Sequence, residues 1–228
     1  MIIYGKQIFL YILDKYPHMV EEIYLSKELE KKLFSKIAKL DKPIIKLDGK
    51  KAQALARGGN HQGFLMKIQD FTYTSFSALK KDNFLLVLYG ITDVGNIGAI
   101  IRSAYALGVD GVIVSGVKSI ALEAVVRTSS GAVFDMPIVL FQDTLTLLNE
   151  LQQAGFVRYA ATMDGEDVRD VDFAQKRVLV MGSEGEGLPA KIIKKCDQKV
   201  KIKMQREFDS LNVSVATAIL CDRMRKDG

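Results

Sequence analysis

The sequence contains no tryptophan and has two cysteines, two histidines and four prolines among its 228 residues. Cys196 and Cys221 cannot form a disulfide framework, and no cluster of cysteine and histidine has zinc-ligand spacing. We therefore expect a reduced, cytoplasmic protein that holds no metal. The apolar segment at 8–13 is shorter than the ~20 residues that span a bilayer, and charged residues follow it, so neither a membrane span nor a secretory signal is predicted.

The positive charge lies in the first third of the chain. Residues 1–82 carry 15 basic and 9 acidic side chains, whereas residues 83–228 carry 17 and 18, so the net charges are +6 and −1. This asymmetry favours a polyanionic partner for the N-terminal part. A solvated, lysine-rich surface would have the same composition.

The first 70 residues combine helical and extended patterns, which predicts a small α/β domain. Residues 71–82 lack a regular period and are predicted to be a linker. The helices are expected at 5–16, 27–39 and 50–56, and the strands at 22–25, 44–47 and 63–68.

From residue 83 onward, apolar strands alternate with helices. Continuous apolar strands such as 84–89 are typical of a parallel sheet that is covered on both faces. Residues 83–228 are therefore predicted to be a doubly wound α/β domain, with any ligand at the carboxyl ends of its strands. The strands are expected at 84–89, 111–114, 137–141, 157–161, 178–181 and 199–204, and the helices at 97–107, 122–128, 144–153 and 211–225.

The first polar strand-end loop, 93–104, leads into a predicted helix. Asn96 is expected to cap that helix. Arg102 lies off the apolar stripe, where it is either a solvated surface residue or an arginine placed to hold a phosphate. The Gly-x-Gly-x-x-Gly fingerprint of dinucleotide-binding folds is absent from this loop.

Two further loops are unusually polar or rich in glycine. Residues 182–187 read Gly-Ser-Glu-Gly-Glu-Gly, which lets the backbone approach a ligand closely but matches neither a nucleophile elbow nor a Walker loop. In the third segment, 202–216, Ser210 is expected to cap the final helix, while Asn212 and Ser214 are polar in an otherwise apolar helix start. The small residues of that helix are compatible with close packing against a second subunit.

Together, these three loops resemble the signature motifs of the SpoU (TrmH-like) family of RNA ribose 2′-O-methyltransferases, a branch of the SPOUT superfamily. The motifs occur in the same order, with Ser-Gly-Ala at 130–132 between them. Near the N-terminus, Ile-Tyr-Gly at 3–5 and His-Gln-Gly at 61–63 resemble the ribosomal-protein-like substrate-binding domain found in members that modify large-subunit ribosomal RNA. The resemblance implies a deep trefoil knot, S-adenosylmethionine as cofactor and a homodimer.

The resemblance also implies site residues. Arg102 would hold a substrate phosphate and help polarise the ribose hydroxyl, because a guanidinium stays protonated and is a poor base. Val94 and Lys203 stand where the family usually has proline. The implied cofactor contacts are Gly182, Ile202 and Leu211, and the implied catalytic residues are Asn96, Arg102, Glu184, Ser210 and Asn212.

We therefore expect 2′-O-methylation of a guanosine in large-subunit ribosomal RNA. One alternative is the same reaction on tRNA. A second is a noncatalytic RNA-binding factor in ribosome assembly, and a third is a nucleotide-dependent oxidoreductase, which the missing fingerprint disfavours.

Overall fold

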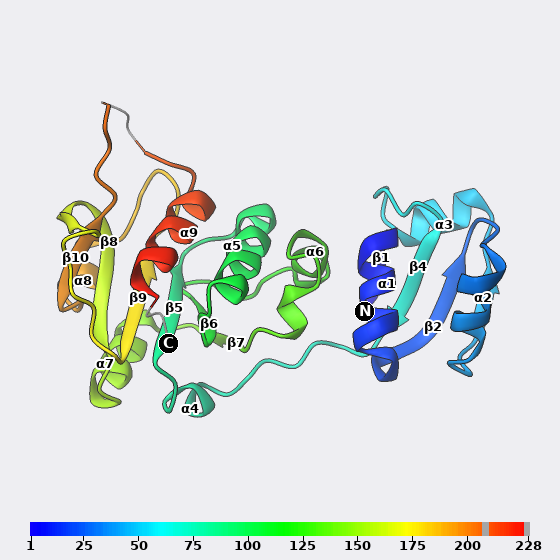
Figure 1. Ribbon diagram of the computed structural model, residues 1–228, viewed down its shortest axis with the longest axis horizontal. Helices are drawn as coiled ribbons and strands as arrows, with labels where there is room; N and C mark the ends of the chain where they lie inside the picture. Colours follow the sequence, from blue (N-terminus) through cyan, green and yellow to red (C-terminus); the bar gives the residue numbers. More distant parts are fainter. Residues whose placement is uncertain (207–209, 226–228) are drawn as a thin grey trace. The chain divides into compact units, whose positions relative to one another are not determined.

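The computed structural model describes residues 1–206 and 210–225, which fall into two compact units (Figure 1). Met1–Thr72 together with Leu122–Gly131 form the first, here called the N-terminal unit. Tyr73–Ala121 and the described residues of Ala132–Gly228 form the second, the C-terminal unit. Phe208 and Asp209, which belong to the third sequence motif, lie outside the described residues.

The N-terminal unit contains a four-stranded mixed sheet in the order β1-β4-β2-β3. Strand β4 pairs antiparallel with β1 and β2, and β2 pairs in parallel with β3. Helix α1 contacts β1 and β4 and buries Ile8, Phe9, Ile12 and Leu13, so the helical apolar stripe of the sequence faces this core. The strands are β1 (Ile2–Tyr4), β2 (Val20–Leu25), β3 (Ile44–Lys46) and β4 (Phe64–Ile68); the helices are α1 (Lys6–Lys15), the 3₁₀ turn η1 (Pro17–Met19), α2 (Lys31–Ala38), α3 (Gly49–Leu55) and α6 (Leu122–Thr128).

The C-terminal unit is built on a parallel six-stranded sheet in the order β10-β8-β9-β5-β6-β7, which confirms the predicted parallel α/β fold. Short helix α4 lies within the range that was predicted to be a linker. The strands are β5 (Phe84–Tyr89), β6 (Gly111–Ser115), β7 (Ile138–Phe141), β8 (Val157–Asp167), β9 (Arg177–Met181) and β10 (Gln198–Lys201); the helices are α4 (Phe76–Leu79), α5 (Val94–Ala106), the 3₁₀ turn η2 (Ala132–Phe134), α7 (Thr144–Gln153), α8 (Ala190–Ile193) and α9 (Val213–Met224).

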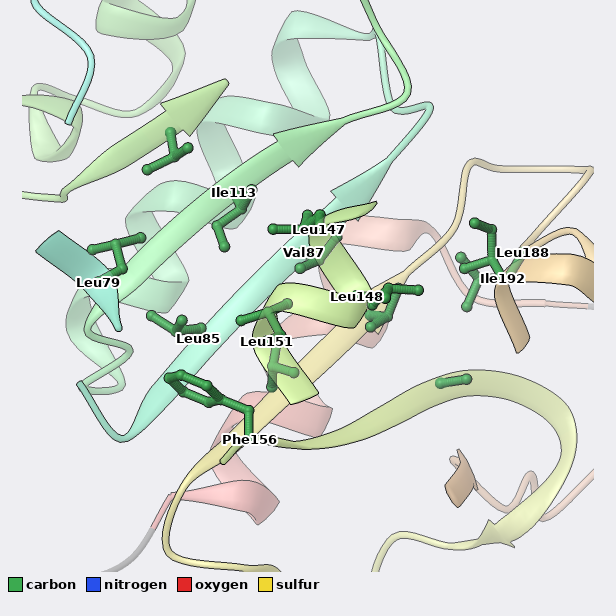
Figure 2. Packing of buried hydrophobic residues seen from close by; sticks show 14 residues of the cluster. Leu79, Leu85, Val87, Ile113, Leu147, Leu148, Leu151, Phe156, Leu188 and Ile192 are labelled. Carbon is green, nitrogen blue, oxygen red and sulfur yellow. The ribbon is translucent and has the colours of Figure 1, made fainter. Parts of the chain in front are cut away.

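The core of the C-terminal unit has a layer on each side of this sheet. Leu85 and Val87 point to one side, where leucines of α7 cover them (Figure 2). Their neighbours in β5, Leu86 and Leu88, are also fully buried, because α5 and α9 pack together and α9 contacts β9. Strands buried on both faces explain the continuous apolar runs in the sequence.

Strand β8 departs from the sequence-based prediction in length and register. It was predicted at 157–161 but continues to Asp167. In the parallel pairing of β10 with β8, Lys199 lies opposite Ala160 and the next residue, Val200, lies opposite Glu166. Residues 161–165 therefore lie between the two β8 residues that pair with Lys199 and Val200, and we call this segment the β8 excursion.

No helix among the described residues is long and apolar enough to cross a bilayer.

Candidate functional site

A cavity of about 610 Å³ lies where the carboxyl ends of β8, β9 and β10 meet the start of α9. The volume falls within the range of small-molecule sites, and the position is the one expected for a ligand of a parallel α/β sheet. Its walls come from the β8 excursion, the glycine loop that follows β9, the segment after β10 and the first turns of α9. Its lining residues include Thr162, Asp164, Gly182, Glu184, Leu188, Lys201, Ile202, Ser210, Leu211 and Val213.

The glycine loop is folded so tightly that its backbone forms one wall of the cavity. A Cβ atom on Gly182 would lie 2.3 Å from the carbonyl carbon of Gly187, a separation that real structures do not contain. The Gly187 amide donates a 3.0 Å hydrogen bond to the Ser183 carbonyl and closes the loop. Gly185 and Gly187 have φ values of +84° and +63°, in the left-handed region that favours glycine. The local fold thus requires glycine at these positions.

All three predicted cofactor contacts, Gly182, Ile202 and Leu211, line this cavity. The buried Leu188 and Val213 add further apolar surface. The cavity therefore combines apolar side chains with closely approaching backbone, a lining that suits the apolar ring and the polar edge of a nucleoside. The lining residues and the size of the cavity therefore fit S-adenosylmethionine, and the three individual cofactor contacts stay predictions.

One hydrogen-bonded cluster joins the three sequence motifs at this end of the sheet. The Asn212 Nδ2 atom donates to Asn96 Oδ1 at 3.0 Å and to Glu184 Oε1 at 2.6 Å. The same Glu184 oxygen accepts from the Val213 amide at 3.1 Å. Residues 96 and 184 meet because β5 and β9, the strands that precede them, are neighbours in the sheet. Residue 212 joins them because α9 returns from the edge strand β10 to contact α5 and β9.

Two predicted helix caps are wrong. Helix α5 begins at Val94, three residues earlier than predicted, and its cap is Asp93, which accepts a 2.7 Å hydrogen bond from the Asn96 amide. Helix α9 is capped by Asn212, whose Oδ1 accepts from the amides of Ser214 and Val215, rather than by Ser210. Because backbone capping is supplied by Asp93, the Asn96 side chain is available to meet Asn212.

Ser210 and Arg102, the two remaining predicted catalytic residues, are both exposed. Ser210 is exposed and lines the cavity. Arg102 is exposed on α5, six residues beyond Asn96, which is about 9 Å along the helix axis. The described lining of the cavity does not include Arg102. The structure therefore brings Asn96, Glu184, Ser210 and Asn212 to the cavity and its rim, and Arg102 follows Asn96 on the same helix.

Sequence reasoning missed the β8 excursion, which contributes Thr162, Met163 and Asp164 to the cavity. A Cβ on Gly165 would lie 2.6 Å from the backbone of Lys199 and Val200, so only glycine lets β10 approach here. The hydrogen bond from Lys199 lowers the pKa of the Asp164 carboxyl. The Asp-Gly pair at 164–165, separated by two residues from the predicted apolar strand, was the available signal, since this dipeptide marks a turn.

The N-terminal motif residues stabilise their own unit. The Gln62 side chain accepts a 3.1 Å hydrogen bond from the Lys6 amide at the start of α1, and His61 Nδ1 accepts from the Gly63 amide at 3.0 Å. A Cβ on Gly59 would collide with the ring of Tyr4. These contacts join the loop before β4 to β1 and α1, so the resemblance at 3–5 and 61–63 coincides with local packing.

Comparison with known families supports the grouping that the motifs suggested. The SpoU rRNA Methylase family matches residues 83–222, and a family described as RNA 2′-O ribose methyltransferase substrate binding matches residues 2–74. A TrmH family tRNA/rRNA methyltransferase of Staphylococcus aureus is 30% identical over 215 residues, covering 89% of this chain and 87% of its own length. A namesake from Staphylococcus haemolyticus is 31% identical with 89% and 86% coverage.

Solved structures share the fold across nearly the whole chain. The SpoU methyltransferase AviRb from Streptomyces viridochromogenes, in complex with AdoMet, has a TM-score of 0.81 at 23% identity and covers 98% of this chain and 88% of its own. An AdoMet-bound rRNA methyltransferase from Sinorhizobium meliloti has a TM-score of 0.76 at 24% identity, with 98% and 86% coverage. A structure concerned with methylation of C/U34 on tRNA matches over 62% of this chain, with a TM-score of 0.56 at 23% identity and 93% coverage of its own chain.

Proposed function

The chain belongs to the SpoU rRNA methylase family, and from this premise we propose that it transfers a methyl group from S-adenosylmethionine to a ribose 2′-hydroxyl in RNA. The observation that carries the proposal is the Asn96–Glu184–Asn212 cluster beside the glycine-walled cavity. It unites the three motif loops at the strand ends, where a parallel α/β sheet binds its ligand.

Methyl transfer requires the ribose hydroxyl to approach in line and to lose its proton. When bound, S-adenosylmethionine supplies the electrophilic methyl group. Asn212, fixed by Glu184 and Asn96, holds the start of α9 against the glycine loop and so sets the shape of the cavity mouth. Arg102 holds an RNA phosphate and polarises the hydroxyl, and a substrate phosphate or water accepts the proton. Ser210 lies beside the reacting ribose.

We propose large-subunit ribosomal RNA, at a guanosine, as the substrate. The net charge of +6 on residues 1–82 and the match of residues 2–74 to a substrate-binding family support an RNA-binding, ribosomal-protein-like N-terminal domain. The same reaction on tRNA is the second candidate, because the similar staphylococcal proteins are named for both RNAs and one similar structure concerns tRNA. Either substrate agrees with the proposed cytoplasmic location.

We propose a trefoil knot and a homodimer for the C-terminal unit. Strand β10 is at the outer edge of the sheet, yet the following helix α9 returns to contact β9 and α5 near the middle, a path that supports threading of the chain. Tyr105 on α5 and Val215 on α9 are 45% and 48% exposed. Apolar side chains of this size on two packed helices support a subunit contact on this face.

Replacement of Arg102 by alanine tests the catalytic assignment. We expect Arg102→Ala to lower turnover at least ~100-fold, because a charged group that stabilises the transition state is removed. S-adenosylmethionine affinity, measured by calorimetry, should stay unchanged, since Arg102 is outside the cavity lining. Arg223→Ala is the matched control, because Arg223 is also exposed but lies near the other end of α9 from Asn212. Loss of cofactor binding in Arg102→Ala, or unchanged turnover, would contradict this role.

A further inference from the structure

The described lining of the cavity has an excess of negative charge. The lining contains three carboxylates, those of Asp164, Glu184 and Glu186, and one ammonium group, that of Lys201. The remaining lining residues are apolar or uncharged. A cavity of this kind stabilises a cationic ligand more than a neutral one of the same shape.

The three carboxylates differ in what holds them. Glu184 already accepts hydrogen bonds from the Asn212 side chain and the Val213 amide. Glu186 is exposed in the glycine loop. Asp164 instead pairs with Lys199, which is outside the cavity lining and has 42% of its side chain exposed. An exposed lysine pair of this kind is weak, so a second cation can compete for the same carboxylate.

Asp164 is also held in a defined position. It lies in the β8 excursion, which is fixed by the change in register between Lys199 and Val200 and by the close backbone contact at Gly165. The hydrogen bond from Lys199, which lowers its pKa, keeps the carboxyl ionised at neutral pH. A permanent negative charge therefore stands at the β8 wall of the cavity.

We propose that Asp164 is a specificity-determining residue, whose carboxylate interacts with the sulfonium-bearing end of S-adenosylmethionine and so favours this cofactor over the product S-adenosylhomocysteine. The inference rests on the proposed function. Methyl transfer turns the positively charged sulfonium into a neutral thioether, so the attraction to Asp164 weakens in the same step. The protein thereby binds its methyl donor and releases its product at one site, and Lys199 pairs again with Asp164 after the reaction.

The test is titration calorimetry of the full chain with S-adenosylmethionine and, separately, with S-adenosylhomocysteine. In Asp164→Asn we expect the affinity for S-adenosylmethionine to fall about fivefold, the size of a partly exposed ion pair, with little change for S-adenosylhomocysteine. Lys199→Met should move the preference in the opposite direction, because it leaves Asp164 without its competing cation. Asp172→Asn is the matched control, since Asp172 is an exposed carboxylate outside the cavity lining.

Two results would overturn the inference. Equal losses for both ligands in Asp164→Asn would mean that the residue shapes the cavity without recognising charge, and unchanged affinities would mean that it does not contact the ligand. Because Lys199→Met keeps Asp164, an unaltered preference in that variant would contradict the inference even if Asp164→Asn unfolds. If the unaltered protein binds neither ligand, the proposed function fails along with the inference.

Discussion

Single residues at the cavity are fixed mainly by backbone contacts. Gly182, Gly165 and Gly187 are required because other backbone segments approach them or because φ is positive. The sequence indicates the loop by composition alone, since three glycines within 182–187 suggest that the backbone approaches a ligand closely. It cannot show that Gly182 meets Gly187 of the same loop, because that contact depends on how the loop closes.

Gly182→Ala should lower cofactor affinity at least tenfold. The added methyl group would have to displace backbone that lies 2.3 Å away, and the displaced Gly187 is part of the cavity wall. Calorimetry with S-adenosylmethionine measures the effect. The control is Gly49→Ala, at the first position of α3, where nothing lies within 4 Å of the new Cβ. That variant should leave affinity unchanged and raise stability by about 0.5 kcal/mol. Unaltered affinity in Gly182→Ala would contradict the assignment of the glycine loop.

The cysteines should be unreactive in the native protein. Burial raises the pKa of both the Cys196 and the Cys221 thiol to about 12. The reactive thiolate is therefore scarce at pH 8, several units below those values. We expect Ellman's reagent at pH 8 to label neither cysteine in the folded chain and both in urea. Rapid labelling of the native protein would show that one thiol is accessible and ionised, contrary to the structure.

At the scale of elements, the sequence predicts the existence and type of most helices and strands but misplaces their ends. The apolar pattern identifies α5, yet the pattern alone cannot choose between Asp93 and Asn96 as its cap. The length of β8 was underestimated because Thr162–Gly165 has the composition of a turn, although pairing with β10 resumes at Glu166. Such errors arise where distant segments decide the local structure.

Asn212→Ala should lower both stability and turnover. The cap of α9 is lost, which costs about 1 kcal/mol, and the link from Glu184 to Asn96 is lost with it. Urea unfolding and methyl transfer measure the two effects. Asp143→Ala is the matched control, because Asp143 caps α7 through Leu145 and Thr146 and is outside the cavity lining. It should lose similar stability and keep full turnover. An equal loss of turnover in both variants would assign the effect to stability alone.

Strands β8 and β10 are joined by an ion pair whose contribution should depend on pH. Asp197, just before β10, accepts hydrogen bonds from the amide, Nε and Nη2 of Arg158, whose side chain is 4% exposed. These hydrogen bonds lower the pKa of Asp197, so its stabilising effect is present above the unfolded-state pKa and is lost as the pH falls through the folded-state value.

Asp197→Asn should therefore destabilise the protein by about 2 kcal/mol at pH 7, because it leaves the Arg158 guanidinium buried without its counter-charge. The expected loss is smaller than for a fully buried pair, because the Asp197 side chain is partly exposed. The difference between the two proteins should shrink when the pH is lowered from 5 to 3. Urea unfolding at pH 7, 5 and 3 measures it. A difference that stays constant across this range would contradict the ion-pair account.

At the scale of the whole molecule, the parallel sheet brings the first two motifs together, and the return of α9 to α5 and β9 adds the third. The apolar strands that alternate with helices along the sequence predicted the sheet but not that return. The mixed sheet of the N-terminal unit was less predictable, because β1 is only three residues long and carries little periodicity. Threading and subunit contacts depend on surfaces far apart in the sequence. The knot entered the sequence-based prediction through resemblance to a family alone, and the homodimer entered through that resemblance together with the small residues of the final helix.

Val215→Asp should disrupt the proposed homodimer. A charge in the middle of an apolar subunit contact is costly, whereas on an exposed helix surface it is tolerated. Light scattering after gel filtration should give the mass of a dimer for the unaltered chain and of a monomer for the variant. Phe34→Asp is the control, since Phe34 is also an exposed apolar residue, 44% exposed, but lies on α2 of the N-terminal unit. A dimer that survives Val215→Asp would place the contact elsewhere.

The most direct test of the central claim is methyl transfer from labelled S-adenosylmethionine to unmodified large-subunit ribosomal RNA and, in parallel, to unmodified tRNA, with the product nucleoside identified. The account predicts label in a 2′-O-methylnucleoside, with guanosine in ribosomal RNA as the proposed product. The same modification in tRNA would keep the chemistry and replace the proposed substrate. Label on a base, or no transfer to either RNA by protein that binds the cofactor, would contradict the account.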